Sequence, residues 1–173
     1  MAEKLAKKLV AAMSGLLALS FGRELIVFII SLMPILELRG GLIAASLLDC
    51  DPVKAYIVSI IGNILPVPFI LLFIEKILEW MQNSRIRFLN SFSNWLYGKV
   101  DKHKSQIETY GFWGLVLFVG IPLPGTGAWT GCLVAACLHM SRKKAFLAAC
   151  LGVLLASIIM MFVSYGVIGN IIR

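Results

Sequence analysis

The sequence predicts an all-α integral membrane protein made of two inverted repeats, joined by an amphipathic interfacial helix. Each repeat is expected to be a re-entrant helical hairpin followed by one transmembrane helix. The chain of 173 residues is 60% hydrophobic and 14% charged, with a mean hydropathy of +0.91, which is far from the composition of soluble domains. Its apolar runs are interrupted by charged residues, proline and glycine, and this pattern recurs after a shift of 90 positions.

The chain is expected to begin with a helix over residues 1–22. Lys4, Lys7 and Lys8 precede the apolar stretch Leu9–Phe21, which is shorter than the ~20 residues that a spanning helix needs. This helix therefore either lies at the membrane interface or crosses the membrane at a tilt.

The first hairpin is expected at residues 25–48, within repeat 1 (23–81). Its apolar run contains Pro34, Glu37, Arg39, Gly40 and Gly41. Charged side chains at the centre of a bilayer cost roughly 2.5–3.5 kcal/mol each on insertion scales and usually mark a pathway or a binding site. Proline ends a helix and paired glycines permit a reversal, so we expect the tip at Pro34, Gly40 and Gly41. A single kinked spanning helix over this run is the alternative.

The second hairpin is expected at residues 111–138, within repeat 2 (109–173). The shift of 90 positions aligns Pro34 with Pro124, Gly41 with Gly131 and Gly62 with Gly152. Weak internal symmetry of interrupted apolar segments is the sequence pattern of many transporters. The second tip is expected to contain the helix-breaking residues Pro122, Pro124, Gly125, Gly127 and Gly131.

One transmembrane helix follows each hairpin, at residues 55–80 and 142–168. A hairpin plus one span makes an odd number of crossings, so the second repeat is inverted relative to the first. The two tips then enter from opposite faces and meet near the midplane of the membrane. We expect a homodimer, because polar tips at that depth need cover that one thin protomer does not provide.

The connector at residues 82–108 is expected to be an amphipathic helix on the cytoplasmic surface. Its apolar residues recur at helical spacing and its basic residues lie between them, as in helices that bind lipid headgroups. The positive-inside rule places this basic segment in the cytoplasm. Contacts of these basic residues with membrane lipids account for the net charge of +7. Nucleic acid is not expected as a partner.

The candidate binding residues lie at the two tips and in the first span. Arg39 carries a permanent charge whose geometry suits phosphate or carboxylate, and Glu37 is the acid placed to couple transport to protons. Asn63, Gly125, Thr126, Gly127 and Trp129 are expected to line the cavity with them. Alternatively, Glu37 and Arg39 pair with each other and only brace the tip.

No metal or cofactor site is expected. Cys50, Cys132, Cys137 and Cys150 form no metal-binding motif, and small apolar packing is the better interpretation. No nucleophile and base are placed together at membrane depth, so enzymatic activity is not expected.

Three motifs together resemble the small multi-drug export proteins: Glu37-x-Arg39-Gly40 after Pro34, Gly62-Asn63, and the segment from Pro122 to Gly131. The layout is more distantly similar to DedA and VTT-domain proteins. The resemblance implies a multi-pass protein of the prokaryotic inner (plasma) membrane. It implies transport of an amphiphilic anion, with a lipid-linked phosphate such as polyprenyl phosphate as the sharpest candidate, and a role for protons. The alternatives are proton-coupled efflux of small molecules or drugs, passive lipid scrambling, and a channel.

Overall fold

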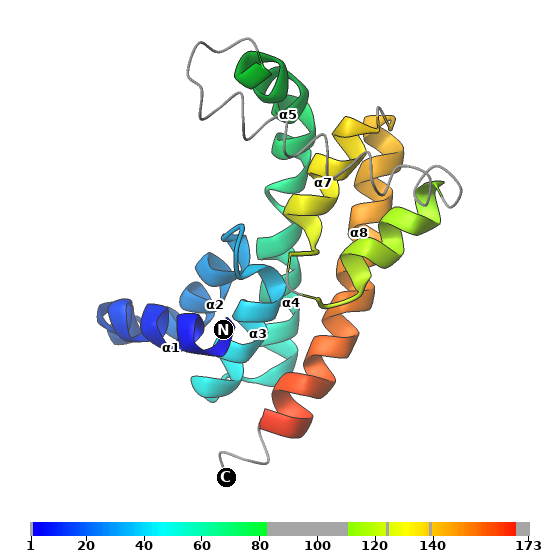
Figure 1. The fold of residues 1–173 in the computed structure, drawn as a ribbon. Coiled ribbons are helices and arrows are strands. Elements are labelled where there is room, and N and C mark those ends of the chain that lie inside the picture. The colour runs from blue at the N-terminus through cyan, green and yellow to red at the C-terminus, as the bar shows by residue number, and fades with distance from the viewer. Residues whose placement is uncertain (1, 83–110, 124, 139, 169–173) are drawn as a thin grey trace.

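The computed structural model describes residues 2–82, 111–123, 125–138 and 140–168 (Figure 1). Over these ranges the secondary structure is helical and contains no strand. The cytoplasmic connector expected at 82–108 lies outside the described residues apart from Gln82. Its amphipathic helix therefore stays a prediction.

The N-terminal part consists of α1 (Ala2–Ala12) and a 3-10 turn (Ser14–Ala18). The helix expected over 1–22 is thus divided in two and α2 begins at its last residue, Gly22. Helix α1 packs against α3 and lies to one side of the bundle (Figure 1).

Helices α2 (Gly22–Leu32) and α3 (Glu37–Leu47) form a helical hairpin. Met33 is extended, with ψ of 138°, as expected of a residue that precedes proline. The Arg23 guanidinium at the start of α2 donates to the Asp49 carbonyl just after α3, at 3.3 Å. The chain therefore reverses, and a single kinked helix over this run is wrong.

The turn of this hairpin differs in one respect from the prediction. It is made by residues 33–36, whereas Gly40 and Gly41 lie inside α3 and are buried. Gly41 serves close packing between helices, because a Cβ there would overlap the Ser31 hydroxyl on α2, whereas a Cβ on Gly40 would come within 2.5 Å of Leu36 Cβ in the turn that precedes α3.

The first long apolar segment runs from Pro52 to Ile74 and consists of α4 (Pro52–Ile64) and the beginning of α5 (Val67–Gln82). Asp51 caps α4 by accepting the Lys54 N–H at 2.9 Å, and Pro52 occupies the first turn, where its missing N–H is harmless. Leu65 and Pro66 separate α4 from α5 within the span expected at 55–80, because Pro66 has no N–H to donate.

The second half repeats this order. The helical residues Gly111–Gly120 are followed by a loop, by α7 (Ala128–Cys137) and by α8 (Arg142–Met161), which continues as a π-helix over Phe162–Ile168. The segment Arg142–Gly166 is the second one that is long and apolar enough to cross a membrane.

Helices α4 and α8 run antiparallel through the molecule (Figure 1). The Ser157 hydroxyl on α8 donates to the Tyr56 hydroxyl on α4 at 3.0 Å. The C-terminal end of α8 reaches the end of α3, where the Ser46 hydroxyl donates to the Ser164 carbonyl at 2.9 Å. The first hairpin therefore lies beside one end of this helix pair, and Figure 1 shows the second hairpin beside the other end.

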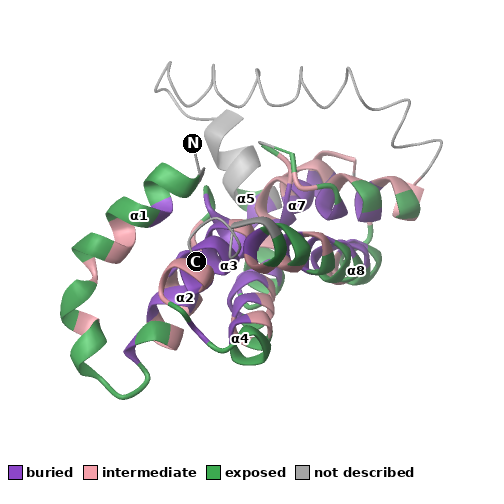
Figure 2. Ribbon diagram, turned by 90° about the horizontal axis from the view of Figure 1, so that it is seen from below, coloured by how far each residue is buried: buried purple, intermediate pink, exposed green. Residues whose placement is uncertain are grey.

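The two long segments carry exposed residues on their outer faces (Figure 2), and many of these residues are apolar. Val53, Ile57, Ile61 and Leu65 recur every four residues along α4 and just beyond it, and each is about half exposed or more. Leu147, Leu151 and Phe162 continue this pattern on α8 and its extension. Soluble monomers rarely expose apolar surface of this extent, so the arrangement is that of a membrane protein.

Matched glycines pack the two halves in the same way. In the first half, Gly41 and Gly62 both lie against α2, and a Cβ on Gly62 would come within 2.9 Å of the Phe28 carbonyl. In the second half, a Cβ on Gly131 or on Gly152 would come within 2.5 Å of a Val119 side-chain atom. Each hairpin and its long helix are therefore in contact at glycine.

Candidate binding site between the hairpin tips

The carboxylate of Glu37 joins the first hairpin to the start of α7. Its Oε2 accepts the Ala128 N–H and its Oε1 accepts the Trp129 N–H, both at 3.1 Å. The side chain is buried. A negative charge here satisfies free amide groups and interacts favourably with the positive end of the helix dipole. Glu37 therefore acts as the N-terminal cap of α7, because the residue that precedes this helix, Gly127, has no side chain to cap it.

The backbone of Glu37 has a φ of +51°, which L-residues with a side chain adopt at a cost of about 1–2 kcal/mol. A residue is held in such a conformation when surrounding contacts demand it, and here those contacts are the two α7 amides.

Gly127 makes room for this carboxylate. It precedes α7 with a φ of +138°, and a Cβ at this position would overlap the Glu37 carboxylate. Glycine is required here both by the backbone conformation and by the close approach.

Arg39 holds the opposite side of the second tip. Its guanidinium donates to the carbonyl oxygen of Leu123, to that of Ile121 at 3.4 Å and to the Thr126 hydroxyl at 2.9 Å. The Thr126 hydroxyl also lies 2.8 Å from the carbonyl oxygens of Ile121 and Leu123. Arg39 thus forms hydrogen bonds with the carbonyl groups that follow helix 111–120. The helix dipole favours a cation at this C-terminal end.

The first turn of α3 therefore contacts the second tip through charge of both signs. Glu37 meets the N-terminal end of one helix of the second hairpin, and Arg39 meets the C-terminal end of the other. Within the described residues Glu37 and Arg39 form no ion pair with each other. Each bonds across to the second hairpin, so the bracing alternative in which they pair only with each other does not describe this geometry.

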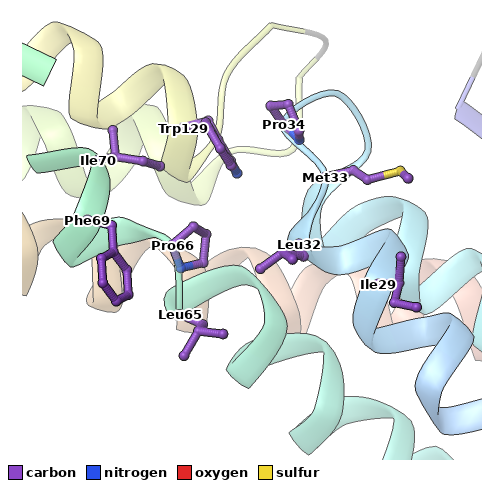
Figure 3. A pocket seen from close by; sticks show the side chains of 9 residues that line it. All are labelled: Ile29, Leu32, Met33, Pro34, Leu65, Pro66, Phe69, Ile70 and Trp129. Carbon is purple, nitrogen blue, oxygen red and sulfur yellow. The ribbon is translucent and has the colours of Figure 1, made fainter. Parts of the chain in front are cut away.

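An apolar groove of about 490 Å³ opens beside this contact (Figure 3). Its walls include Leu32 and Pro34 from the first hairpin, Pro66 from the break in the long segment, Phe69 from α5 and Trp129 from α7. All nine residues that line it are apolar or aromatic. The buried indole Nε1 of Trp129 has no hydrogen-bond partner among the described residues.

The structure brings together most of the residues predicted from the sequence. Glu37, Arg39, Thr126, Gly127 and Trp129 meet at the tip contact. Pro122 and Gly125 lie in the same loop, with Gly125 at a φ of +85°. Pro34 lines the groove. Gly131 lies inside α7 and packs against Val119, and Pro124 lies outside the described residues.

Asn63 is placed differently from the prediction. It is buried on α4 and its Oδ1 has no hydrogen-bond partner among the described residues, but it does not line the groove. The groove instead uses Leu65, Pro66, Phe69 and Ile70. The prolines Pro66 and Pro68 could have indicated these groove residues in the sequence. A break in a spanning helix leaves side chains exposed that a continuous helix would pack.

Residues 37–159 match the sequence model of a family described as "Putative small multi-drug export protein". This match covers more than half of the chain. The chain belongs to this family of small multi-drug export proteins. No curated protein and no solved structure matches the chain.

The family description and the two apolar segments together make this a membrane protein of an export family. Export is not an enzyme class. The described residues contain no group of three or more histidine, cysteine, aspartate or glutamate side chains that would suit a metal ion. The relationship to DedA and VTT-domain proteins stays a resemblance.

Proposed function

We propose that the protein exports small molecules across the inner membrane by separating and rejoining the two hairpin tips. The contact of Glu37 and Arg39 with the second tip is the observation that carries this proposal. Five hydrogen bonds from two charged side chains join the two hairpin tips. Flanked by two long apolar segments, they form a barrier that can open without unfolding either hairpin. This is the geometry that alternating access requires.

The proposal treats both hairpins as re-entrant and the two halves as inverted repeats. Support comes from the reversal of the chain between α2 and α3, from the antiparallel α4 and α8, and from the matched glycine contacts. In this arrangement the tips meet near the midplane, and broken backbone at that depth is satisfied by the opposite tip instead of by water.

Proton coupling would act through Glu37. As a carboxylate it accepts two amide hydrogen bonds at the start of α7. Protonation would remove its charge and convert one oxygen into a donor facing another donor. The tip contact would then weaken, and the second hairpin would be free to move away from α3. One proton per opening would couple the gradient to export.

Replacement of Glu37 tests this coupling. Glu37→Gln mimics the protonated side chain, so export in liposomes should lose its dependence on a pH gradient, while the protein still inserts and folds. Glu24→Gln at the start of α2 is the matched control and should retain the dependence. Export by Glu37→Gln with its full pH dependence would end the coupling proposal.

An amphiphilic anion is the second candidate substrate, and the environment of Arg39 favours it. All three of its acceptors are neutral, and a phosphate would be a stronger acceptor than any of them. A lipid-linked phosphate could therefore displace the second tip from Arg39. Scrambling and channel activity remain outcomes of the same assay.

A liposome assay that compares polyprenyl phosphate with a neutral aromatic dye separates the two substrates. If the anion is the cargo, Arg39→Lys should reduce its transport at least tenfold, because a point charge replaces a forked donor. If neutral molecules are the cargo, both the wild-type protein and this variant should move the dye and leave the phosphate in place. Movement of lipid without any gradient would indicate scrambling.

The proposed orientation places the connector in the cytoplasm and the start of α4 outside. Val53 at the start of α4 and Lys143 at the start of α8 are both exposed. In a background without the four native cysteines, Val53→Cys should react with an impermeant thiol reagent from outside and Lys143→Cys only from the cytoplasm. Reaction of both from one face would contradict the inverted repeats.

We further propose a homodimer, in which a second copy covers part of the exposed apolar faces of α4 and α8. Mass measurement in nanodiscs should then give twice the 19.0 kDa of one chain. Detection of the single chain alone would contradict the dimer.

A further inference from the structure

The apolar groove beside the tips has features of a binding site for one class of molecule. Its volume of about 490 Å³ falls within the ~300–1,000 Å³ that small-molecule sites usually have. Two aromatic side chains, Phe69 and Trp129, belong to its walls (Figure 3). No charged side chain lines it, so a charged group would lose its hydration there without compensation.

The groove opens toward the surface that faces lipid. Leu65 and Phe69 are part of its wall, and their side chains are 48% and 59% exposed. Both belong to the long segment whose outer face is apolar. A molecule dissolved in the bilayer can therefore enter sideways, without passing through water.

Trp129 connects this groove to the tip contact. Its backbone N–H donates to Glu37 Oε1, while its indole forms part of the groove wall. The buried Nε1 has no acceptor among the described residues. A buried donor without an acceptor is unfavourable, and a rotation of the indole toward the groove would allow a bound molecule to supply one. An acyl chain has no such acceptor to offer.

We propose that this groove binds an uncharged, mainly apolar small molecule that carries a hydrogen-bond acceptor, and that the acceptor takes the Trp129 indole N–H. The inference rests on the proposed export function, since such a molecule would be the exported substrate. Because the backbone N–H of Trp129 also donates to Glu37, an occupied groove acts directly on the residue proposed to respond to protons.

Benzophenone and diphenylmethane provide a matched pair of probes. They share two aromatic rings, and only benzophenone has a carbonyl acceptor. Benzophenone also attaches to nearby C–H bonds under light, so mass spectrometry of the full-length protein in nanodiscs reports where it binds. Labelling should concentrate on groove residues, with Met33 favoured, and diphenylmethane should compete more weakly than unlabelled benzophenone.

Variants of Trp129 then distinguish the contribution of its aromatic ring to the groove wall from that of its indole N–H as a hydrogen-bond donor. Trp129→Phe keeps an aromatic wall without the N–H and should weaken benzophenone binding about tenfold, the size expected for one buried hydrogen bond. Competition by diphenylmethane should change less than about twofold. Trp113→Phe is the matched control, because Trp113 is 64% exposed outside the groove, and it should bind both probes as the wild-type protein does.

A blocking variant tests the site itself. Leu65→Trp should fill the groove mouth and reduce binding of both probes, whereas Ile61→Trp, one turn earlier on the exposed face of α4, should reduce neither. Equal affinity of the two probes for the wild-type protein would mean that the groove holds plain hydrocarbon such as a lipid chain, and would overturn the proposal. So would labelling that Leu65→Trp does not reduce. Probe binding without export would refute the proposed function alone.

Discussion

The two hairpin tips have the same place in their halves but opposite chemistry. The first is a tight turn at residues 33–36 followed by two charged side chains in α3. The second is a loop over residues 121–127 that has no ionisable residue and two glycines at positive φ. The shift of 90 positions sets Gly127 against Glu37 and Trp129 against Arg39. One tip supplies side-chain charge and the other supplies free backbone groups.

This comparison shows how two hairpins of similar build can form a specific contact. A second acid at position 127 would place two carboxylates together in an apolar environment, where like charges repel strongly. A glycine at that position instead leaves the space that the Glu37 carboxylate occupies. The two tips are complementary because they differ, even though the helices that carry them pack alike.

Gly127→Ala should have the largest effect on this complementarity. The new Cβ would overlap the Glu37 carboxylate and would also be strained at a φ of +138°. Losing the cap of α7 and straining the backbone together should lower the stability by about 3 kcal/mol or more. The measurement is thermal unfolding in detergent, together with export in liposomes, which should be lost.

Gly125→Ala is the matched control for backbone strain. Its φ is +85°, but a Cβ there would meet no atom within 4 Å. It should cost only the strain of a left-handed residue, about 1–2 kcal/mol. If Gly125→Ala and Gly127→Ala were equally destabilising, the space around Glu37 would not be what requires glycine at 127.

Much of the fold was predictable because proline, glycine and the apolar periodicity constrain the backbone locally. Pro34 predicted the break between α2 and α3, and the loop from Pro122 to Gly127 was expected for the same reason. The roles of Gly40, Gly41 and Gly131 were not predictable. Whether a glycine makes a turn or a close helix contact depends on neighbours that only the folded chain brings near.

The sequence indicated most of the residues that meet at the tip contact, but not the hydrogen bonds that join them. Charge within an apolar run pointed to Glu37 and Arg39, and broken backbone pointed to Thr126 and Gly127. The sequence did not indicate that each charge bonds to the other hairpin, since partners more than 80 residues apart leave no local pattern. The groove was missed for a related reason: apolar side chains that line a cavity and those that fill a core look the same in a sequence.

The matched glycines Gly41 and Gly131 offer a test in which the two halves should respond alike. Gly41→Ala would overlap the Ser31 hydroxyl, and Gly131→Ala would come within 2.5 Å of Val119 Cγ2. Overpacking of a buried contact typically costs about 1–3 kcal/mol. The lost stability should be partly restored by shortening the side chain that the new Cβ meets. Ser31→Ala should do this for Gly41→Ala, and Val119→Ala for Gly131→Ala.

Exchanging these second substitutions is the control. Ser31→Ala should not restore Gly131→Ala, and Val119→Ala should not restore Gly41→Ala, because neither shortened side chain is among the atoms that the other Cβ would meet. Restoration across the halves would show that the packing of the two hairpins is coupled through more than the tip contact. Thermal unfolding of the four double variants decides between these outcomes.

The smallest expected difference is between the residues that precede the two long helices. The shift of 90 positions sets Asp51 against Ser141. Asp51 accepts the Lys54 N–H at 2.9 Å, whereas the Ser141 side chain makes no capping hydrogen bond to α8. Removal of a working cap costs about 1 kcal/mol, so Asp51→Ala should lower the unfolding temperature measurably and Ser141→Ala should leave it nearly unchanged. Equal losses would mean that Ser141 caps α8 in the membrane, and the two halves would then be more alike at these helix starts than at their tips.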